Sequence, residues 1–437
     1  MSVAGLLAEI AEIGRDEARG GYSRHLFDEA DLELRAWFEE RAAELGLRME
    51  HDGNGNLWAW WDAGDADAGA IATGSHLDSV PGGGAYDGPL GVVSALEAVR
   101  MLRADGFVPS RPIAVCVFAE EEGSRFNAPC LGSRLLVGDA DPQALRVRTD
   151  AEGLTLGEVW AGAGHDPDRM GADPALLARL AAFVELHVEQ GRDLVDRGSA
   201  VAVATAIIPH GRWRARFEGA GNHAGTTPMS DRHDPVVALA AGVLAVREVA
   251  AAGGPLARGT VGRVRVTPGG SNVIASRAEA WIDLRAETDD EVRALLERTV
   301  SALGAAAETE GCTLTVFEES FSSRVDFDAD LRDRIARVLG EVPGVAVGGS
   351  AGGIPGSVPG RAPGSVPGRA PGSVPAIPTG AGHDAGILAP HVPTAMIFVR
   401  NPTGVSHAPG EGASDEDCET GARGLAAVLR DLAGAPR

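Results

Sequence analysis

The stretch from Gly74 to Glu97, GSHLDSVPGGGAYDGPLGVVSALE, holds side chains suited to binding a metal ion. His76, Asp78 and Asp87 lie on a glycine-rich segment that follows the apolar residues 70–72. Neutral imidazole and carboxylate are common metal ligands, and glycine lets the backbone approach an ion closely. Asp78 is two residues from His76 and is therefore able to hold the far ring nitrogen of that histidine. By itself, the stretch is equally compatible with a polar turn that carries solvated acids.

Three adjacent acids, Glu120, Glu121 and Glu122, follow the apolar run RPIAVCVFA at residues 111–119. A continuous apolar run of this length is typical of a strand buried on both faces of a sheet. Carboxylates at a buried strand end repel one another unless a cation compensates them. A solvated acidic turn is the alternative, but the apolar character of the run favours a cation site.

A third candidate is His187, in the segment FVELHVEQG at residues 183–191. Alternate side chains of a strand share a face, so Glu185 and Glu189 are expected to point the same way as this histidine. A lone buried histidine is usually only hydrogen-bonded, but two neighbouring acids favour a metal ligand over that simpler explanation.

These segments imply an α/β sheet, because in such sheets functional sites form at the carboxyl ends of the strands. Apolar spacing and turn residues predict the elements of this part of the chain. They are two helices within residues 2–46, a hairpin over 49–61, strands at 70–72, 111–119 and 183–191, and helices at 90–99 and 176–182.

A chain of 437 residues is too long for one ordinary core, so two domains are expected. Residues 211–325 alternate predicted strands and helices but carry no acids or histidines at the strand ends, which indicates a separate α+β domain. This domain is expected to be inserted into a discontinuous domain of residues 1–210 and 326–437. Its predicted strands are 213–219, 260–267, 278–285 and 312–317, and its predicted helices are 235–251 and 289–303. Its candidate site residues are His223, Asn272, Asp283 and Arg285. A simple ion pair along one strand is the alternative explanation for Asp283 and Arg285.

Residues 353–375 are a low-complexity segment in which PGSVPGRA occurs twice. Proline and glycine at this density do not build a packed core, so an extended insertion is expected. Beyond it, residues 394–399 are predicted to be a strand, and His407 lies on the loop NPTGVSHAPGE at 401–411. The last helix is predicted at 414–432.

Composition excludes several classes of protein. The net charge of −23 argues against nucleic acid and anionic membrane surfaces, and no apolar window is long enough to span a membrane. The four cysteines form no CxxC pair, which makes the cytoplasm the expected setting. No lysine is present, so Schiff-base chemistry and a P-loop lysine are excluded.

Six ordered motifs, GSHLDSVPGGGAYDGPLG, EEGSRF, ELHVEQG, NHAGTTPM, GAGHDA and PTGVSHAPGE, together resemble the amidohydrolase branch of the M20 metallopeptidase superfamily. That branch includes allantoate amidohydrolases, N-carbamoyl-L-amino-acid hydrolases and β-ureidopropionases, and the resemblance covers the chain except for the repeat. It implies a mixed-sheet α/β metallohydrolase domain with an inserted α+β dimerisation, or lid, domain. It also implies a homodimer through that lid.

The resemblance assigns roles by position. It implies two divalent ions, either Zn or one of Mn, Co and Ni, with Asp87 as the carboxylate that bridges them. It also implies that Glu121 is the general base and that Asp78 orients a metal ligand. The implied metal ligands are His76, Asp87, Glu122, His187 and His407. The implied substrate contacts are Gln190, His223, Asn272, Arg285 and His383, with Arg212 a further candidate and His223 also placed to stabilise the developing oxyanion.

The expected reaction is hydrolysis of a ureido, carbamoyl or related linear amide bond of a small carboxylated substrate. Two ions polarise the carbonyl and activate water, and a nearby carboxylate moves the proton. The alternatives are a metallopeptidase acting on dipeptides and a metal-binding relative without turnover. Two departures from the family pattern, Ala275 after Asn-Val-Ile and Ala286 after Arg285, bear on substrate identity.

Overall fold

The computed structural model describes residues 2–345 and 373–434. The chain divides into two compact units, one of Met1–Thr205 with Asp326–Arg437 and the other of Ala206–Val325, here called unit 1 and unit 2. The boundaries expected from sequence were 210/211 and 325/326. Most of the predicted repeat insertion, residues 353–372, lies outside the described residues.

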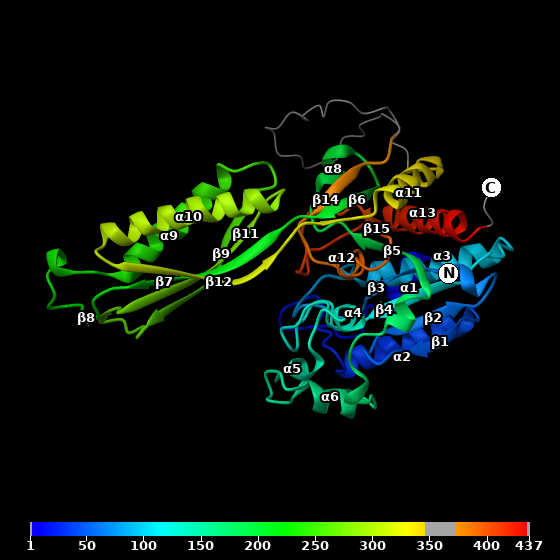
Figure 1. Ribbon diagram of the computed structural model, residues 1–437, viewed down its shortest axis with the longest axis horizontal. Helices are drawn as coiled ribbons and strands as arrows, with labels where there is room; N and C mark the ends of the chain where they lie inside the picture. The colour runs from blue at the N-terminus through cyan, green and yellow to red at the C-terminus, as the bar shows by residue number, and fades with distance from the viewer. Residues whose placement is uncertain (1, 346–372, 435–437) are drawn as a thin grey trace. The chain divides into compact units, whose positions relative to one another are not determined.

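Unit 1 is built on a nine-stranded mixed sheet (Figure 1). Its central strands β4, β3, β5 and β15 run parallel, whereas β1 and β2 are antiparallel to their neighbours and β6 is antiparallel to β15. The predicted mixed-sheet α/β fold is therefore confirmed.

In spatial order the strands are β1 (Arg48–His51), β2 (Leu57–Trp61), β4 (Ile113–Phe118), β3 (Ala70–His76), β5 (Leu180–Val188), β15 (Thr394–Val399), β6 (Val201–Ile207) and β13 (Val325–Asp326), with β14 (Ala376–Thr379) paired to β6.

The main core of unit 1 lies between this sheet and its long helices, which bury Leu96, Ile335 and Leu429 against strand residues such as Val115 and Ile397. The long helices are α2 (Glu29–Glu44), α3 (Pro89–Ala104), α11 (Ala329–Glu341) and α13 (Asp415–Ala433), and the short α1 (Val3–Glu9) also packs into this core. Shorter helices lie in the connections: α4 (Leu131–Val137), α5 (Pro142–Arg146), α6 (Leu156–Gly162), α7 (Pro174–Leu177), α8 (Asp193–Arg197) and α12 (Asp384–Leu388). The hairpin predicted over residues 49–61 is present as the antiparallel pair β1 and β2, with Arg48 opposite Trp60.

The helix expected at residues 176–182 is wrong in its second half. Helix α7 ends at Leu177, and strand β5 already begins at Leu180. Its first residues pair with β3 on one side, and Phe183 begins the pairing with β15 on the other. Backbone hydrogen bonds to two neighbours and burial of the apolar side chains outweigh the helix propensity of the alanines.

Unit 2 is a four-stranded antiparallel sheet with two helices on one face (Figure 1). Leu239, Val246 and Leu295 of the helices pack on Phe217 and Ile282 of the sheet. The strands in spatial order are β12 (Thr313–Ser322), β7 (His210–Glu218), β11 (Arg277–Arg285) and β9 (Arg258–Thr267), and the helices are α9 (Pro235–Ala251) and α10 (Asp289–Thr309). A separate two-stranded pair is formed by β8 (Asn222–His223) and β10 (Val273–Ile274).

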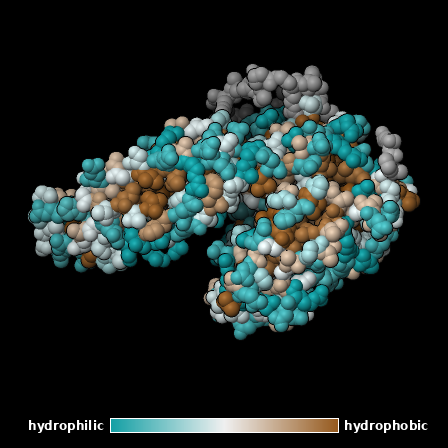
Figure 2. Space-filling model, in the orientation of Figure 1, coloured by the Kyte–Doolittle hydropathy of each residue, from teal (hydrophilic) through white to brown (hydrophobic). Residues whose placement is uncertain are grey.

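Hydrophobic side chains also reach the surface of unit 2 along its helices (Figure 2). On α9, Val236, Val237 and Leu244 are 37%, 48% and 60% exposed. They share a helix whose opposite side enters the core, so α9 is apolar on more than its inner face. Such a surface is typical of a protein–protein contact.

Candidate metal centre

His76 is the last residue of β3, and its ring is buried beside the N-terminus of α3. The ring fits there because residue 88 is glycine with a φ of 84°. A Cβ at that position would lie 2.4 Å from Cε1 of His76. Nδ1 of His76 lies 3.1 Å from the carbonyl oxygen of Asp78. A carbonyl only accepts hydrogen bonds, so Nδ1 carries the proton and Nε2 keeps its lone pair.

His187, near the end of β5, has the same arrangement. Its Nδ1 lies 2.9 Å from the carbonyl oxygen of Val188, and its Nε2 lies 3.2 Å from Oδ1 of Asp87. Within the described residues, Nε2 of His187 and Nε2 of His76 are both buried without a hydrogen-bond partner. Two unpartnered imidazole lone pairs near one carboxylate oxygen are the donor set of a metal site.

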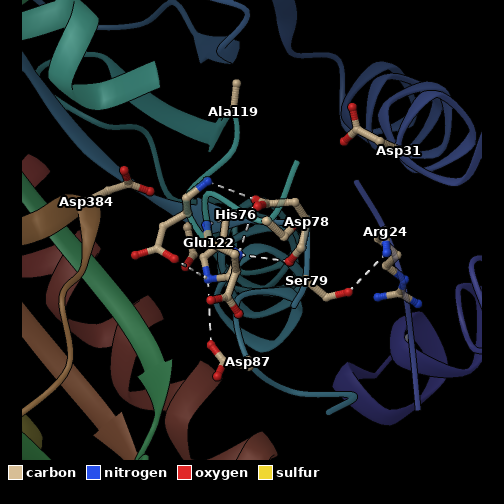
Figure 3. A network of polar contacts seen from close by, with 12 residues as sticks. Arg24, Asp31, His76, Asp78, Ser79, Asp87, Ala119, Glu122 and Asp384 are labelled. Carbon is tan, nitrogen blue, oxygen red and sulfur yellow. Dashed lines mark hydrogen bonds and ion pairs between the residues drawn. The ribbon is translucent and has the colours of Figure 1, made fainter. Parts of the chain in front are cut away.

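Asp87 lies within reach of both histidines, and Figure 3 shows it at one end of the polar network around His76. Its Oδ1 is 3.7 Å from Nε2 of His76, and its Oδ2 accepts hydrogen bonds from Gln190 (2.8 Å) and Ser406 (2.9 Å). Burial would raise the pKa of Asp87, but the imidazole of His187, 3.2 Å away, and the rings of His76 and His407 hold that pKa well below its usual range. Asp87 therefore keeps a negative charge at the centre of the cluster.

His407 and Glu122 form the other side of the cluster. Nε2 of His407 lies 3.4 Å from Oδ2 of Asp87 and 3.4 Å from Oε2 of Glu122. His407 has a positive φ of 56° on the loop that precedes α13, and its side chain is 49% exposed. Burial, followed by the charge of Asp87, raises the pKa of Glu122 to about 8. A cation at this position would favour the ionised carboxylate.

Asp78 supports both β3 and the acidic loop. Its carboxylate accepts hydrogen bonds from the backbone N–H groups of Glu121 (3.1 Å) and Glu122 (3.0 Å), and Oδ1 lies 3.5 Å from Nδ1 of His76. The expected contact with the histidine is thus shared between the carbonyl and the carboxylate of Asp78. One side chain thereby positions a histidine and two glutamates from separate strand ends.

Glu121 points one carboxylate oxygen toward the centre and the other away from it. Oε2 lies 3.8 Å from Nε2 of His76, whereas Oε1 accepts a hydrogen bond from the thiol of Cys130 at 3.4 Å. The backbone N–H of Cys130 also donates to the carbonyl of Glu121 at 2.7 Å. Burial and the charge of Glu122 raise the pKa of Glu121 well above its usual range. A buried carboxylate of high basicity suits proton transfer.

Two sets of three ligand atoms meet at Asp87, with the atoms of each set within 4.8 Å of one another. They are His76, Asp87 and His187 in one set, and Asp87, Glu122 and His407 in the other. Nitrogen and oxygen donors with free buried lone pairs fit a divalent metal ion. A third set, Glu185, His187 and His383, is less suitable, because Glu185 already accepts hydrogen bonds from Ser75 (2.7 Å) and from the N–H of Ala385 (3.0 Å).

The remaining candidates of unit 1 have distinct surroundings. Gln190 contacts Asp87 directly, as described above, and the ring of His383 is buried against His187 with centroids 4.5 Å apart. Glu189 does not share the face of His187, because it lies beyond the strand and accepts hydrogen bonds from the N–H groups of Asp193 and Leu194 at the start of α8.

The candidates of unit 2 lie on its strands and the adjoining loops. Arg285 makes two hydrogen bonds to Asp283, at 2.8 and 3.1 Å, and Arg212 lies 3.5 Å from the same carboxylate. Nδ1 of His223 accepts a hydrogen bond from the N–H of Gly225 at 3.0 Å. Asn272 uses its backbone carbonyl to accept from the N–H of Ala224 at 3.1 Å.

Sequence reasoning missed three residues that hold this centre together: Ser406, Cys130 and Glu411. One carboxylate oxygen of Glu411 accepts hydrogen bonds from the N–H groups of Tyr86 (2.9 Å) and Asp87 (3.0 Å). Residue 84 must be glycine to admit this carboxylate, since a Cβ there would lie 2.1 Å from Oε2 of Glu411. Ser406 and Glu411 lie inside the PTGVSHAPGE motif, but their partners are more than three hundred residues away in sequence.

Comparison with known proteins places this geometry in context. Residues 72–361 match Peptidase family M20/M25/M40. An N-carbamoyl-L-amino acid amidohydrolase of Geobacillus stearothermophilus is 36% identical over 427 residues, covering 98% of this chain and 97% of that protein. An allantoate amidohydrolase of Escherichia coli is 30% identical over 429 residues, covering 97% and 96%. The crystal structure of a hydantoinase/carbamoylase family amidase from Burkholderia multivorans has a TM-score of 0.83 at 29% identity, covering 100% of this chain and 98% of that one.

Within residues 2–345 and 373–434, no helix has the length and apolar character that a membrane span requires.

We predict that Glu411→Ala weakens metal binding by about 10- to 100-fold, because losing a group that orients a ligand has an effect of this size. Glu411→Gln is the matched control, since a single amide oxygen can accept from both N–H groups that now share one carboxylate oxygen. Isothermal titration with Zn²⁺ or Mn²⁺ measures the affinity, and circular dichroism checks the fold. Equal affinity of the folded Ala variant and the wild type would contradict this role.

Proposed function

Because this chain belongs to Peptidase family M20/M25/M40 and is a hydrolase of non-peptide carbon–nitrogen bonds, we propose that it cleaves a ureido or carbamoyl group from a small carboxylated substrate. The observation that carries the proposal is the pair of ligand sets that share Asp87, in a chain whose amidohydrolase relatives match it almost from end to end. N-carbamoyl-L-amino acids and allantoate are the two favoured substrates.

We propose that two divalent ions bind, one held by His76, Asp87 and His187 and the other by Asp87, Glu122 and His407. Such ions polarise a carbonyl and lower the pKa of a nearby water. The nitrogen and oxygen donors suit Zn, Mn, Co or Ni and do not select among them.

Glu121 is the proposed general base. It takes a proton from the attacking water as the C–O bond forms, and it passes that proton to the leaving nitrogen as the C–N bond then breaks. The thiol of Cys130 holds one carboxylate oxygen away from the centre, which leaves the other oxygen directed inward for the proton. Asp78 keeps Glu121 and Glu122 at fixed positions through their backbone N–H groups.

The proposed substrate contacts in unit 2 are His223, Asn272, Arg285 and Arg212. Since Nδ1 of His223 accepts a hydrogen bond, the neutral ring carries its proton on Nε2 and can donate it to a developing oxyanion. Arg285 offers the planar fork that a carboxylate requires, and Asp283 orients that fork. In unit 1, Gln190 and His383 are proposed to contact the substrate beside Asp87 and His187.

We also propose a homodimer formed through unit 2, with the apolar face of α9 covered by a second copy. The exposed Val236, Val237 and Leu244 support this assignment. The described cysteines are all free, which supports a cytoplasmic setting. Light scattering of wild type and of a Leu244→Gln variant tests the dimer.

A substrate panel tests the proposed reaction directly. Ammonia release is measured with allantoate, N-carbamoyl-L-amino acids and β-ureidopropionate, and release of the free amino acid is measured with N-formyl or formimino amino acids, each with added Mn, Zn, Co or Ni. Glycine-containing dipeptides are the comparison for peptidase activity. Chelator-sensitive release from a ureido compound supports the proposal, whereas cleavage confined to dipeptides, or no turnover by metal-loaded protein, overturns it.

We predict that Asp87→Ala abolishes binding of both ions, because Asp87 belongs to both ligand sets. His187→Ala and His407→Ala serve as comparisons, since each removes a ligand from one set and should weaken mainly one ion. Mass spectrometry of the native protein counts the ions bound. One ion retained at full affinity in Asp87→Ala would refute the bridging role.

We predict that Glu121→Gln keeps its metal but loses about 10²- to 10⁴-fold or more in kcat, the contribution of a general base. Glu120→Gln is the control, because that neighbouring carboxylate is used to accept hydrogen bonds from the N–H groups of Arg125 and Phe126, which an amide oxygen also accepts. Steady-state kinetics and metal content are measured on both variants. Near-normal turnover in metal-loaded Glu121→Gln would rule out this assignment.

We predict that Arg285→Lys lowers kcat/KM for carboxylated substrates, because an ammonium does not reproduce two parallel hydrogen bonds. A simple ion pair with Asp283 is the alternative role of Arg285. If Arg285→Lys and Arg285→Ala both stay within about threefold of wild type, which is less than about 1 kcal/mol of transition-state stabilisation, the carboxylate is held elsewhere and Arg212 is tested next.

A further inference from the structure

One face of the unit 2 sheet is rich in arginine although the chain as a whole is strongly acidic. The net charge of the protein is −23, yet residues 206–325 hold thirteen arginines against fifteen acids. Strand register assigns the arginines to faces, because residues directly opposite each other in antiparallel strands share a face. The face opposite α9 and α10 carries eight of them: Arg212, Arg214, Arg216, Arg258, Arg263, Arg265, Arg277 and Arg285.

Acids compensate only part of this charge. Glu279 and Glu319 pair with Arg214, and Glu279 also pairs with Arg216 at 3.1 Å. Asp283, on the same face, pairs with Arg285 and Arg212. In contrast, Arg263 and Arg265 are both exposed, and within the described residues neither forms an ion pair with a carboxylate. The face therefore keeps an excess of positive charge, concentrated on the edge strand β9.

Trp281 lies at the centre of the excess charge. In the sheet register it is opposite both Arg263 and Arg214. The guanidinium carbons of Arg263 and Arg265 lie 4.4 and 5.8 Å from its ring centroid. The indole N–H of Trp281 donates to Glu319 at 3.1 Å, which fixes the ring on this face. Stacking holds the two guanidinium groups in place while leaving their N–H groups to solvent.

We propose that this arginine face attracts the anionic, carboxylated substrate and raises its local concentration before binding. The inference rests on the proposed function, because Arg285 and Arg212, the proposed carboxylate contacts, belong to the same face. A patch of one charge sign raises the local concentration of ligands of the opposite sign, and this attraction is screened by salt. Arg263 and Arg265 contribute to it through their charge, without contacting the bound substrate.

The kinetic test uses Arg263→Gln/Arg265→Gln on the otherwise intact enzyme. The control is Arg247→Gln/Arg298→Gln, which removes the same charge from α9 and α10 on the other side of unit 2. Arg263→Lys/Arg265→Lys keeps the charge. We expect the Gln pair to lower kcat/KM about threefold at low salt with kcat unchanged. The difference in kcat/KM between the Gln pair and wild type should disappear near 0.5 M salt, where the screening length is roughly 4 Å. The Lys pair and the control pair should have the kcat/KM of wild type.

An unchanged kcat/KM in the Gln pair at low salt, or an equal fall in the control pair, overturns the proposal. A Gln pair that changes the molecular mass by light scattering at low salt also overturns it, because the face would then be a contact between protein molecules.

A second readout does not depend on activity and separates this inference from the proposed function. Quenching of Trp281 by iodide, corrected with a Trp281→Phe variant for the other tryptophans, is compared with quenching by neutral acrylamide. We expect the iodide-to-acrylamide ratio to fall about twofold in the Gln pair but not in the control pair. If no ureido compound is hydrolysed but this ratio falls, the anion-attracting face stands and the proposed reaction fails. If the iodide-to-acrylamide ratio is unchanged in the Gln pair, the proposal that this face attracts anions is wrong.

Discussion

The position of the Asp87 carboxylate is the constraint on which the rest of the centre depends. Its two oxygens face imidazoles from three different segments, the end of β3, the end of β5 and the loop before α13. The first and last of these segments lie more than three hundred residues apart along the chain. A shared carboxylate therefore requires that the sheet, α3 and the C-terminal loop be assembled before any ligand set is complete. The glycines at positions 84 and 88 provide the space for Glu411 and His76 around it.

Burial of so many acids in one place has a free-energy cost that the surrounding structure offsets in several ways. Backbone N–H groups donate to Asp78, Glu120 and Glu411, and imidazoles lie against Asp87. Even so, burial raises the pKa of Glu120 and of Glu122 to about 8 and that of Glu411 to about 7. Carboxylates held this far from their ordinary pKa are stabilised in the ionised form by a bound cation. The types of the ligand atoms and the raised pKa values of the buried carboxylates thus both favour a cation at this site.

The sheets of the two units differ in how many of their faces are buried. Unit 1 uses parallel strands buried on both faces, which keeps the ligands rigid at the strand ends. Unit 2 uses an antiparallel sheet with helices on one face only, so its other face is left to polar and charged residues. Arg285 and Trp281 occupy that face because they alternate with buried residues such as Ile282 and Leu284. An antiparallel sheet of this kind presents a broad array of side chains rather than a single convergent point.

Much of the centre was predictable from sequence because its ligands lie at the ends of apolar strands, where residue type and period both carry information. His76, Asp87, Glu122, His187 and His407 were named from motifs, and the resemblance to a family supplied the pairing that spacing alone left open. Elements with a strong period, such as β7 with its alternately buried residues, were also predicted. Tertiary structure decided where local signals were silent or misleading. Residues 180–182 form a strand because β3 pairs with this part of the chain, and Glu189 accepts hydrogen bonds at the start of α8 because its strand ends at Val188. Cys130, Ser406 and Glu411 act on partners distant in sequence, so only the folded chain brings them to Glu121 and Asp87.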